Sequence, residues 1–266
     1  MNDESIRSIH EYENETWSRC ADTYLDTFSG LTNQMLSKLI DITNLGTGAK
    51  VLDLGCGPGN STRACRDAGA EVTGIDFSQD MIQVAREANP DIAYKLANLE
   101  ALPEEDDSYD IVIANYVVHH LPDPSKVFAE VARVLKSGGR FAFAVWGTQE
   151  EQSSIGCFVQ AVSEHYKSAE LPHGPLYGVT DKAIFSPMLE AVNLRKFTLS
   201  NHHLIWSCET LSPVIDGLWT WANCNALDVD TQNNIRAQMI ENSAEFANDH
   251  GYAFPHTAIL GSAVKE

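Results

Sequence analysis

Short apolar stretches alternate with amphipathic segments through the middle of the chain. The apolar stretches predict five strands, at 49–55, 71–76, 92–99, 109–115 and 140–146. The amphipathic segments between them predict helices, with Ser78 and Asp123 as N-caps and with Gly69, Pro90 and Gly138 marking helix ends. Because strands that alternate with helices are buried on both faces, this rhythm predicts a parallel sheet wound in right-handed βαβ units.

The two ends of the chain depart from this rhythm. Before it, a helix is predicted over 5–28, with Trp17, Tyr24 and Phe28 on one apolar stripe. After it, the pattern predicts helices at 151–167 and 181–191, a long strand at 195–207, a wholly helical stretch at 209–250 and a last strand at 255–264. The whole chain is therefore expected to form one α/β domain around a doubly wound, mostly parallel sheet of seven strands. An N-terminal helix and a helical insertion between the sixth and seventh strands complete it.

The charge balance argues against several classes of partner. Lys and Arg number 18 against 37 Asp and Glu, which gives a net charge of −19. A surface this negative repels phosphate backbones and anionic lipid, so neither nucleic acid nor membrane is an expected partner. The chain has no apolar run of about eighteen residues and no apolar leader, so a cytoplasmic protein is expected. The cysteines and histidines show no zinc-site spacing, and no metal is predicted.

The stretch KVLDLGCGPGNST, residues 50–62, runs from the first strand into the first helix of the alternating region. Its three glycines on alternate positions let the backbone approach a ligand closely, and the helix N-terminus that follows favours an anionic group. A dinucleotide loop would need a third glycine where Asn60 stands, and it has no use for the charge of Asp53. A carboxylate there suits an ammonium group, so the pattern indicates an amino-acid moiety.

The second strand ends in Asp76, 21 residues after Gly55 (76 − 55). An acidic side chain at that point accepts hydrogen bonds from ribose hydroxyls. A ligand with an amino acid at one end and a nucleoside at the other has the constitution of S-adenosylmethionine.

Five motifs carry a family resemblance. They are D-L-G-C-G-P-G-N-S-T, G-I-D-F-S-Q-D-M-I, A-N-L-E-A-L-P, Y-D-I-V-I-A-N with H-H-L-P-D, and L-K-S-G-G-R-F. In order and placement they resemble class I S-adenosylmethionine-dependent methyltransferases, in the small-molecule branch that includes the ubiquinone and menaquinone enzymes. The resemblance is strong over residues 15–147 and weak beyond them. It implies that 1–48 form a helical cover and 49–147 the cofactor-binding core.

The resemblance also implies roles for individual residues. The loop around Gly55, Cys56 and Gly57 would contact the methionine part of S-adenosylmethionine, and Asp76 its ribose. The other expected cofactor contacts are Phe77 and Met81 on the adenine ring, Asn98 and Leu99 at its edge, Asn115 beneath the methionine, and Tyr24 over the pocket.

The methyl acceptor is expected to be a small molecule. Enzymes acting on exocyclic base amines usually carry an Asn/Asp-Pro-Pro-aromatic turn after the fourth strand, whereas this chain has Asn115-Tyr116-Val117-Val118. The second half of the chain is rich in rings that could line an acceptor pocket: Trp146, Phe158, Tyr166, Tyr177, Trp206, Trp219 and Trp221. Such a pocket favours a largely apolar or aromatic metabolite. The segment 148–208 would form the substrate side, 209–250 a cap that roofs it, and 251–266 the final strand.

Two roles are open for His120. It could act as the base that takes a proton from the acceptor, because in the related phosphoethanolamine methyltransferases a similarly placed histidine works with an N-terminal tyrosine, here Tyr24. It could instead hold the strand-to-helix loop, which the occurrence of H-H-L-P-D across enzymes of varied chemistry favours. A protein that binds S-adenosylmethionine without transferring its methyl group is the alternative function. The oligomeric state is open.

Overall fold

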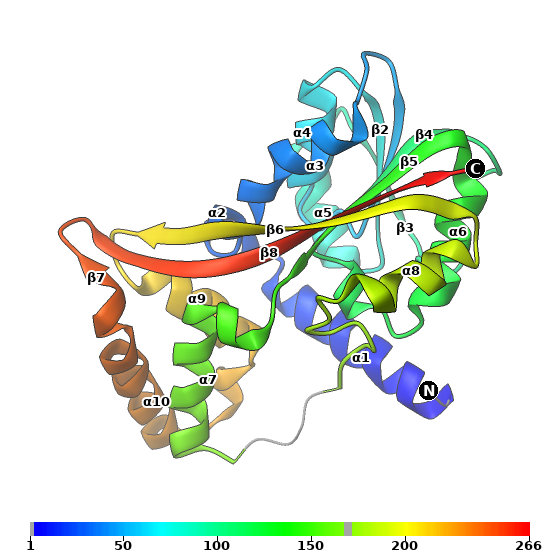
Figure 1. Ribbon diagram of the computed structural model, residues 1–266. Helices are drawn as coiled ribbons and strands as arrows, with labels where there is room; N and C mark the ends of the chain where they lie inside the picture. The colour runs from blue at the N-terminus through cyan, green and yellow to red at the C-terminus, as the bar shows by residue number, and fades with distance from the viewer. Residues whose placement is uncertain (1–2, 168–171) are drawn as a thin grey trace.

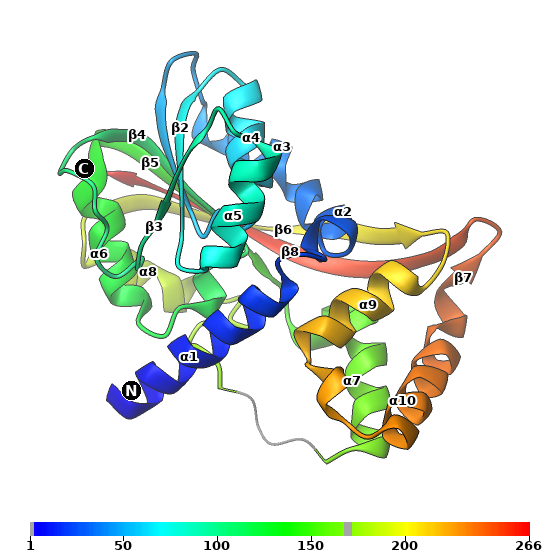
Figure 2. The same cartoon turned by 180° about the vertical axis from the view of Figure 1, so that it is seen from behind.

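The computed structural model describes residues 3–167 and 172–266, whose strands form one mixed sheet (Figures 1 and 2). The strand order is β3-β2-β1-β4-β5-β8-β6, with β7 paired to β8 at the side. β8 runs antiparallel to both β5 and β6, and the pairs from β3 to β5 are parallel. The strands are β1 Lys50–Leu54, β2 Glu71–Asp76, β3 Ala93–Leu96, β4 Tyr109–Asn115, β5 Leu135–Trp146, β6 Leu194–Cys208, β7 Ala247–Asn248 and β8 Gly251–Lys265. The predicted doubly wound, mostly parallel architecture is confirmed.

Helices cover both faces of this sheet. They are α1 Asp3–Cys20, α2 Ser29–Thr32, α3 Leu36–Thr43, α4 Asn60–Asp67, α5 Gln79–Ala88, α6 Pro124–Val134, α7 Ser153–His165, α8 Lys182–Glu190, α9 Ser212–Trp221 and α10 Val229–Asn242. The two predicted N-caps are present, since the Ser78 side chain accepts from Met81 N and the Asp123 side chain from Lys126 N.

The sheet has a buried apolar cluster on each face, because the side chains of a strand point alternately to the two faces. On β4, Ile111 and Ile113 belong to one buried cluster, which includes residues of α3, α7, α9 and α10. Val112 and Ala114 belong to the other, which includes residues of α6 and α8. The middle strands are thus mostly apolar, and Asp76 and Asn115 stand at the ends of β2 and β4.

The N-terminal helix is shorter than the predicted 5–28. α1 ends at Cys20, and short helical turns, including one at Tyr24–Asp26, carry the chain on to α3. Thr23 Oγ1 donates to Cys20 O at 3.3 Å, and Thr27 Oγ1 donates to Thr23 O at 2.8 Å. Threonine side chains that bond to nearby backbone carbonyls compete with the helical ladder. The apolar stripe therefore changes direction after α1, and Tyr24 lies in the turn that follows the helix.

The helix predicted to close at Gly138 ends earlier, at Val134. The amides of Asp107 and Ser108 donate to the carbonyls of Arg133 and Val134, which satisfies the helix end from outside. β5 starts at Leu135 at once, and its pairing with β4 shifts register before Arg140. Gly138, at φ +80°, therefore belongs to an irregularity inside a strand.

The insertion between β6 and β8 is mostly helical, as expected, but it is not wholly so. Asn223, at φ +54°, follows α9, and Asp228 caps α10. β7 then pairs with β8, which begins at Gly251 rather than at 255. α9 and α10 pack on α7 below the projecting ends of β6 and β8 (Figures 1 and 2). Asn242 Nδ2 donates to Cys157 O at 3.0 Å in this packing.

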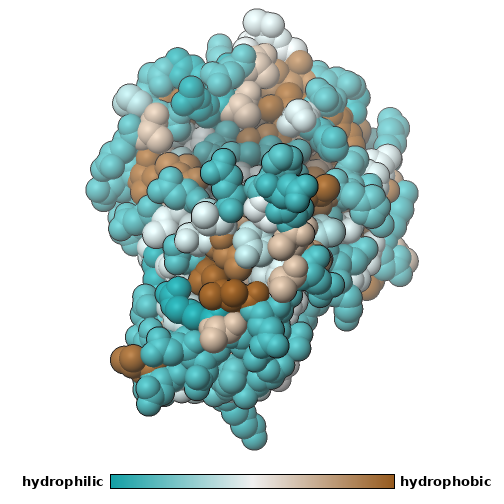
Figure 3. Space-filling model, turned by 90° about the vertical axis from the view of Figure 1, so that its left-hand side faces the viewer, coloured by the Kyte–Doolittle hydropathy of each residue, from teal (hydrophilic) through white to brown (hydrophobic). Residues whose placement is uncertain are grey.

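The outer surface is largely hydrophilic on one face of the molecule. On the face drawn in Figure 3, hydrophilic residues predominate and apolar residues form small groups between them. No helix among the described residues is long and apolar enough to cross a membrane.

Candidate active site

The glycine loop after β1 has the backbone geometry that close approach to a ligand requires. Gly55 and Gly57 have φ of +60° and +53°, values that side chains disfavour. A Cβ on Gly55 would lie 2.4 Å from Val117 Cγ2, so the loop packs directly on the chain after β4. A Cβ on Gly57 would meet nothing within 4 Å, because this residue lines a pocket.

Asp76, at the end of β2, is tied to that loop. Its Oδ2 accepts from Gly57 N at 2.8 Å and its Oδ1 from Ser78 N at 2.9 Å. Burial raises the pKa of the Asp76 carboxyl, although the backbone amides of Ser78, Gly57 and Phe77 oppose this shift. A carboxylate has about four acceptor positions, so two amides leave capacity for hydroxyl groups of a ligand.

Asp53 lies beneath the pocket floor rather than in its wall. Its Oδ2 accepts from Ser61 Oγ at 2.7 Å and from Thr62 Oγ1 at 2.6 Å, which ties β1 to the start of α4. Burial raises the pKa of Asp53 to about 7. Its Oδ1 has no hydrogen-bond partner among the described residues. The expected contact with an ammonium group would therefore have to reach this buried oxygen.

A first pocket lies over the loop at the carboxyl ends of the strands. Most of the predicted cofactor residues line it: Tyr24, Gly55, Cys56, Gly57, Asp76, Phe77, Met81 and Asn115. Asn115 Oδ1 is buried there without a partner, so the wall offers an acceptor to a ligand.

Asn98 and Leu99 lie in an adjoining hollow that shares Phe77, Val117 and His120 with the first pocket. Leu99 is buried and Asn98 is exposed. The amide oxygen of Asn98 accepts from Glu100 N at 2.9 Å. This hydrogen bond does not use the NH₂ group of Asn98, which could donate to a ligand.

A second pocket, lined mostly by rings, meets the first one at Trp17, Tyr24, Thr32, Tyr116 and His120. Its other lining residues are Phe28, Leu31, His119, Trp146, Ile155, Tyr177, Trp206, Leu218, Trp221 and His256. None of these described lining residues is Asp, Glu, Lys or Arg.

Four of the seven rings expected around the acceptor therefore line this pocket. The other three do not. Phe158 and Trp219 are buried in the core, and Tyr166 is 45% exposed.

His120 lies where both pockets and the adjoining hollow meet. Its Nδ1 is 3.0 Å from Glu13 Oε1, and its ring contacts Trp17 edge to face at 5.2 Å between centroids. Trp17 Nε1 donates to Glu13 Oε2 at 2.8 Å. Residues of α1 thus hold the imidazole from across the pocket, in addition to the loop that carries it.

Tyr24 lies on the other side of Trp17, with their ring centroids 6.1 Å apart. Its hydroxyl donates to Thr32 Oγ1 at 3.5 Å, and burial raises the pKa of the phenol to about 12. The structure therefore brings Tyr24 and His120 to the same pocket with an indole between them.

Sequence reasoning missed Glu13, Tyr116, His119 and His256. A signal existed for Glu13, because it stands one helical turn before Trp17 and so shares its face. Tyr116, His119 and His256 belong to no motif that marks a pocket, and only the tertiary fold gathers them. Among the described residues, no group of three or more His, Cys, Asp or Glu could hold a metal ion.

Comparison with known proteins agrees with this geometry. Residues 52–143 match the family model described as a methyltransferase domain. Demethylmenaquinone methyltransferase of Renibacterium salmoninarum is 34% identical over 115 residues, 43% of this chain and 48% of that protein. A malonyl-[acyl-carrier protein] O-methyltransferase of Serratia marcescens is 30% identical over 156 residues, 59% and 61% of the two chains. The chain spans about half the length of the first curated relatives it matches.

Solved structures show the same fold. The YcgJ protein of Bacillus subtilis superposes with a TM-score of 0.60 over 88% of this chain and 99% of its own, at 23% identity.

Residues 52–143 therefore match a methyltransferase domain in sequence, and they lie in a sheet with the Rossmann-like strand order. Domains of this class I type use S-adenosyl-L-methionine as their cofactor.

Proposed function

We propose that the protein transfers a methyl group from S-adenosylmethionine to a small, largely apolar or aromatic acceptor by in-line displacement. The observation that carries this proposal is the second pocket, which is lined by rings, carries no charged side chain among its described residues, and opens on the cofactor loop's pocket. Bound S-adenosylmethionine supplies a sulfonium methyl group. The protein's part is to align an acceptor with that methyl group and to keep water out.

The walls of the first pocket fit S-adenosylmethionine. Asp76 has acceptor capacity for ribose hydroxyls, Gly57 leaves space where a side chain would stand, and Asn115 Oδ1 lacks a partner. Phe77 and Met81 offer apolar surface to a base, and Asn98 and Leu99 lie beyond them. We propose these residues, with Tyr24, Gly55 and Cys56, as the cofactor site.

We further propose His120 as the residue that receives the acceptor's proton. A carboxylate only accepts hydrogen bonds, so the contact with Glu13 places the hydrogen of His120 on Nδ1 and leaves Nε2 as an acceptor. Glu13 acts as a positioning residue, because it fixes both the tautomer and the ring. The indole of Trp17 fixes Glu13 in turn. Tyr24 is proposed to shape the pocket wall.

The experiment starts with purified protein, methyl-labelled S-adenosylmethionine and a small-molecule extract. Mass spectrometry should find metabolites that gain one methyl group. If the cofactor binds and the label never leaves it in any extract, the protein uses S-adenosylmethionine for another purpose and the proposal fails. The acidic composition supports a companion proposal, that the acceptor is not a nucleic acid. A cytoplasmic location is also proposed.

The role of His120 is tested once an acceptor is known. His120→Ala should lower turnover by about 10²–10⁴-fold while cofactor affinity is kept, and Glu13→Gln should shift the pH profile of turnover. The control is His10→Ala, which removes a histidine from the helix that carries Glu13. A lower melting temperature with unchanged turnover per folded molecule would instead assign His120 to holding the loop.

A further inference from the structure

His119 is buried in the wall of the second pocket without a hydrogen-bond partner. It is 2% exposed, and neither ring nitrogen has a partner among the described residues. Burial and the neighbouring His120 hold the pKa of His119 well below its usual value, so the ring is neutral. A neutral imidazole presents one donor and one acceptor. Buried polar groups left unpaired are costly and rare, and each needs an explanation.

Tyr116 contributes a second unpaired polar group, which we call an orphan group, to the same pocket. Its hydroxyl is buried without a partner, and its ring lies 3.9 Å from that of Trp146. The residue directly follows β4 in a left-handed conformation, φ +60°, which is unfavourable for a bulky side chain. Strain of this kind is found where the surrounding structure holds a side chain in position for a task. A phenylalanine would fill the same space without an unpaired hydroxyl.

His256, the other buried histidine that lines this pocket, has a hydrogen-bond partner for each ring nitrogen. His256 Nδ1 lies 2.8 Å from Gln152 Oε1, and its Nε2 lies 3.0 Å from Ser154 Oγ. The amide nitrogen of Gln152 donates to Thr257 O, so its oxygen is the atom that accepts from His256. His256 is thereby occupied on both sides. Among the described residues that line this pocket, the buried polar atoms without a partner are the Tyr116 hydroxyl and the two nitrogens of His119.

We propose that His119 and Tyr116 bind a hydroxyl group of the acceptor, which is therefore an uncharged ring compound of the phenol type. This inference rests on the proposed methyl transfer and narrows its substrate class. The rings of the pocket bind the acceptor's apolar body, and the two orphan groups orient it through its oxygen. A charged group would be desolvated there without a counter-ion, which is strongly unfavourable.

The test measures binding to the S-adenosylhomocysteine-loaded protein by titration calorimetry, with three probes that share one ring system. The probes are 2-naphthol, naphthalene and 6-hydroxy-2-naphthoate. We expect 2-naphthol to bind about tenfold more tightly than naphthalene, because naphthalene has no hydroxyl group to pair with His119 and Tyr116. It should also bind at least tenfold more tightly than the naphthoate, whose carboxylate would be buried.

Variants separate recognition from packing. Tyr116→Phe and His119→Phe should each lower 2-naphthol affinity several-fold and leave naphthalene affinity unchanged. The melting temperature of the free protein should stay the same or rise, since each change removes an unpaired buried group. Tyr177→Phe is the matched control, because that tyrosine lines the same pocket but is 41% exposed. It should keep the preference for 2-naphthol.

The inference is overturned if no neutral probe shows saturable binding, if 2-naphthol and naphthalene bind equally, or if the preference survives both variants. Tight binding of the naphthoate would overturn it as well. Failure of the proposed function is visible separately, because binding preferences do not depend on whether a label leaves the cofactor.

Discussion

Asp76 serves both the loop and the ligand proposed to lie over it. Its two oxygens accept from the amides of Gly57 and Ser78, so the carboxylate shapes the site as well as offering acceptor positions to ribose. A substitution at this position should therefore affect cofactor affinity and folding stability together.

Asp76→Ala should weaken S-adenosylhomocysteine binding at least tenfold, because charge-assisted hydrogen bonds contribute roughly 1.5–3 kcal/mol each. It should also lower the free energy of unfolding by about 1–3 kcal/mol, since two amides lose their acceptor. Calorimetry and urea denaturation measure the two effects. Asp80→Ala, which removes the same charge from an exposed position on α5, should change neither. Unchanged affinity in Asp76→Ala would mean that the ribose assignment is wrong.

His256 makes the fold sensitive to acid. Burial lowers its pKa to about 4 in the folded protein, against about 6.5 in the unfolded chain. Between these values the unfolded chain binds a proton that the folded protein does not, so the free energy of unfolding falls as the pH falls from about 6.5 to about 4. Asp53, whose pKa is raised to about 7, contributes with the opposite sign over much of this range.

His256→Asn isolates the first contribution, because Asp53 is present in both proteins. The stability difference between wild type and variant should shrink by about 3 kcal/mol between pH 7 and pH 4. Urea denaturation across this range measures it. Parallel stability curves would show that His256 does not stay neutral when the protein is folded.

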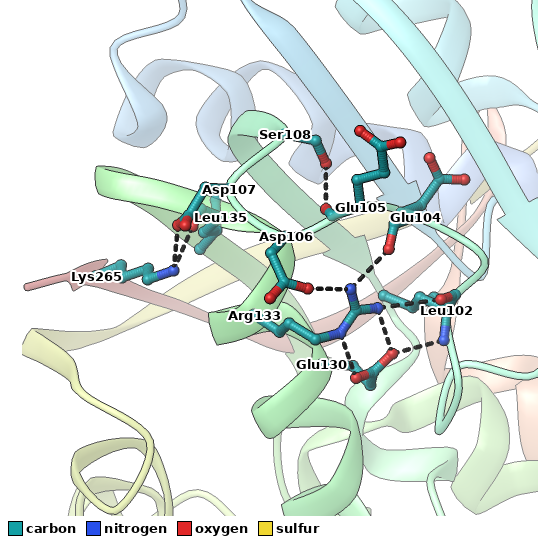
Figure 4. Close-up of polar contacts among 10 residues, drawn as sticks. All are labelled: Leu102, Glu104, Glu105, Asp106, Asp107, Ser108, Glu130, Arg133, Leu135 and Lys265. Carbon is teal, nitrogen blue, oxygen red and sulfur yellow. Dashed lines mark hydrogen bonds and ion pairs between the residues drawn. The ribbon is translucent and has the colours of Figure 1, made fainter.

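At the scale of elements, an arginine of α6 makes several of the contacts that hold the loop between β3 and β4 (Figure 4). Arg133 forms a two-bond contact with Glu130, at 2.7 Å for each bond. It also donates to the carbonyls of Leu102 and Glu104, at 3.0 and 2.6 Å, and to Asp106. A planar guanidinium can reach all of these groups at once, whereas an ammonium group cannot.

Arg133→Lys should therefore lower the free energy of unfolding by about 1–2 kcal/mol despite keeping the charge. It should also weaken cofactor binding by a few-fold, because Asn98 and Leu99 stand on the same loop. Arg63→Lys is the control. Its ion pair with Asp67 is exposed at both side chains, so the change should stay within about 0.5 kcal/mol. Equal effects in the two variants would show that the loop is held by other contacts.

The sequence predicted the elements well where local signals suffice. The strands from β1 to β5 and the caps Ser78 and Asp123 follow from periodicity and capping chemistry. The early end of α1 depends on threonine side chains that bond to backbone carbonyls, and the early end of α6 depends on amides of a distant loop. For the second pocket, the sequence predicted a lining rich in rings but only part of the residues that form it. Glu13 and His120 are 107 positions apart, and no local pattern indicates their contact.

At the scale of the molecule, β6 and β8 run beyond the rest of the sheet and carry α7, α9 and α10 at one end (Figures 1 and 2). Leu218 and Trp221 of α9 line the second pocket. The buried residues of α9 and α10 belong to the same cluster as those of the sheet and of α7. The insertion therefore shares the hydrophobic core of the sheet and α7. We propose that it covers the acceptor pocket as a roof.

Replacing residues 209–251 by Asn-Gly would join Cys208 and Tyr252, which are already paired, through a two-residue turn. S-adenosylhomocysteine affinity should stay within a few-fold, and transfer to the native acceptor should be lost. Trp221→Ala tests the same idea if the shortened chain does not fold, and its acceptor KM should rise at least tenfold. Loss of cofactor binding in a folded variant, or unchanged transfer, would contradict the roof assignment.

Helix α1 is attached on two sides. Ser18 Oγ lies 3.1 Å from Ser78 Oγ at the start of α5, and Arg19 donates to the carbonyls of Thr220 and Trp221 at the end of α9. Any movement of α1 that uncovers the cofactor also disturbs the helix over the acceptor. We therefore expect an ordered kinetic scheme, in which a bound acceptor slows the escape of S-adenosylhomocysteine. Release of that product would then limit steady-state turnover, and the first turnover would be seen as a burst.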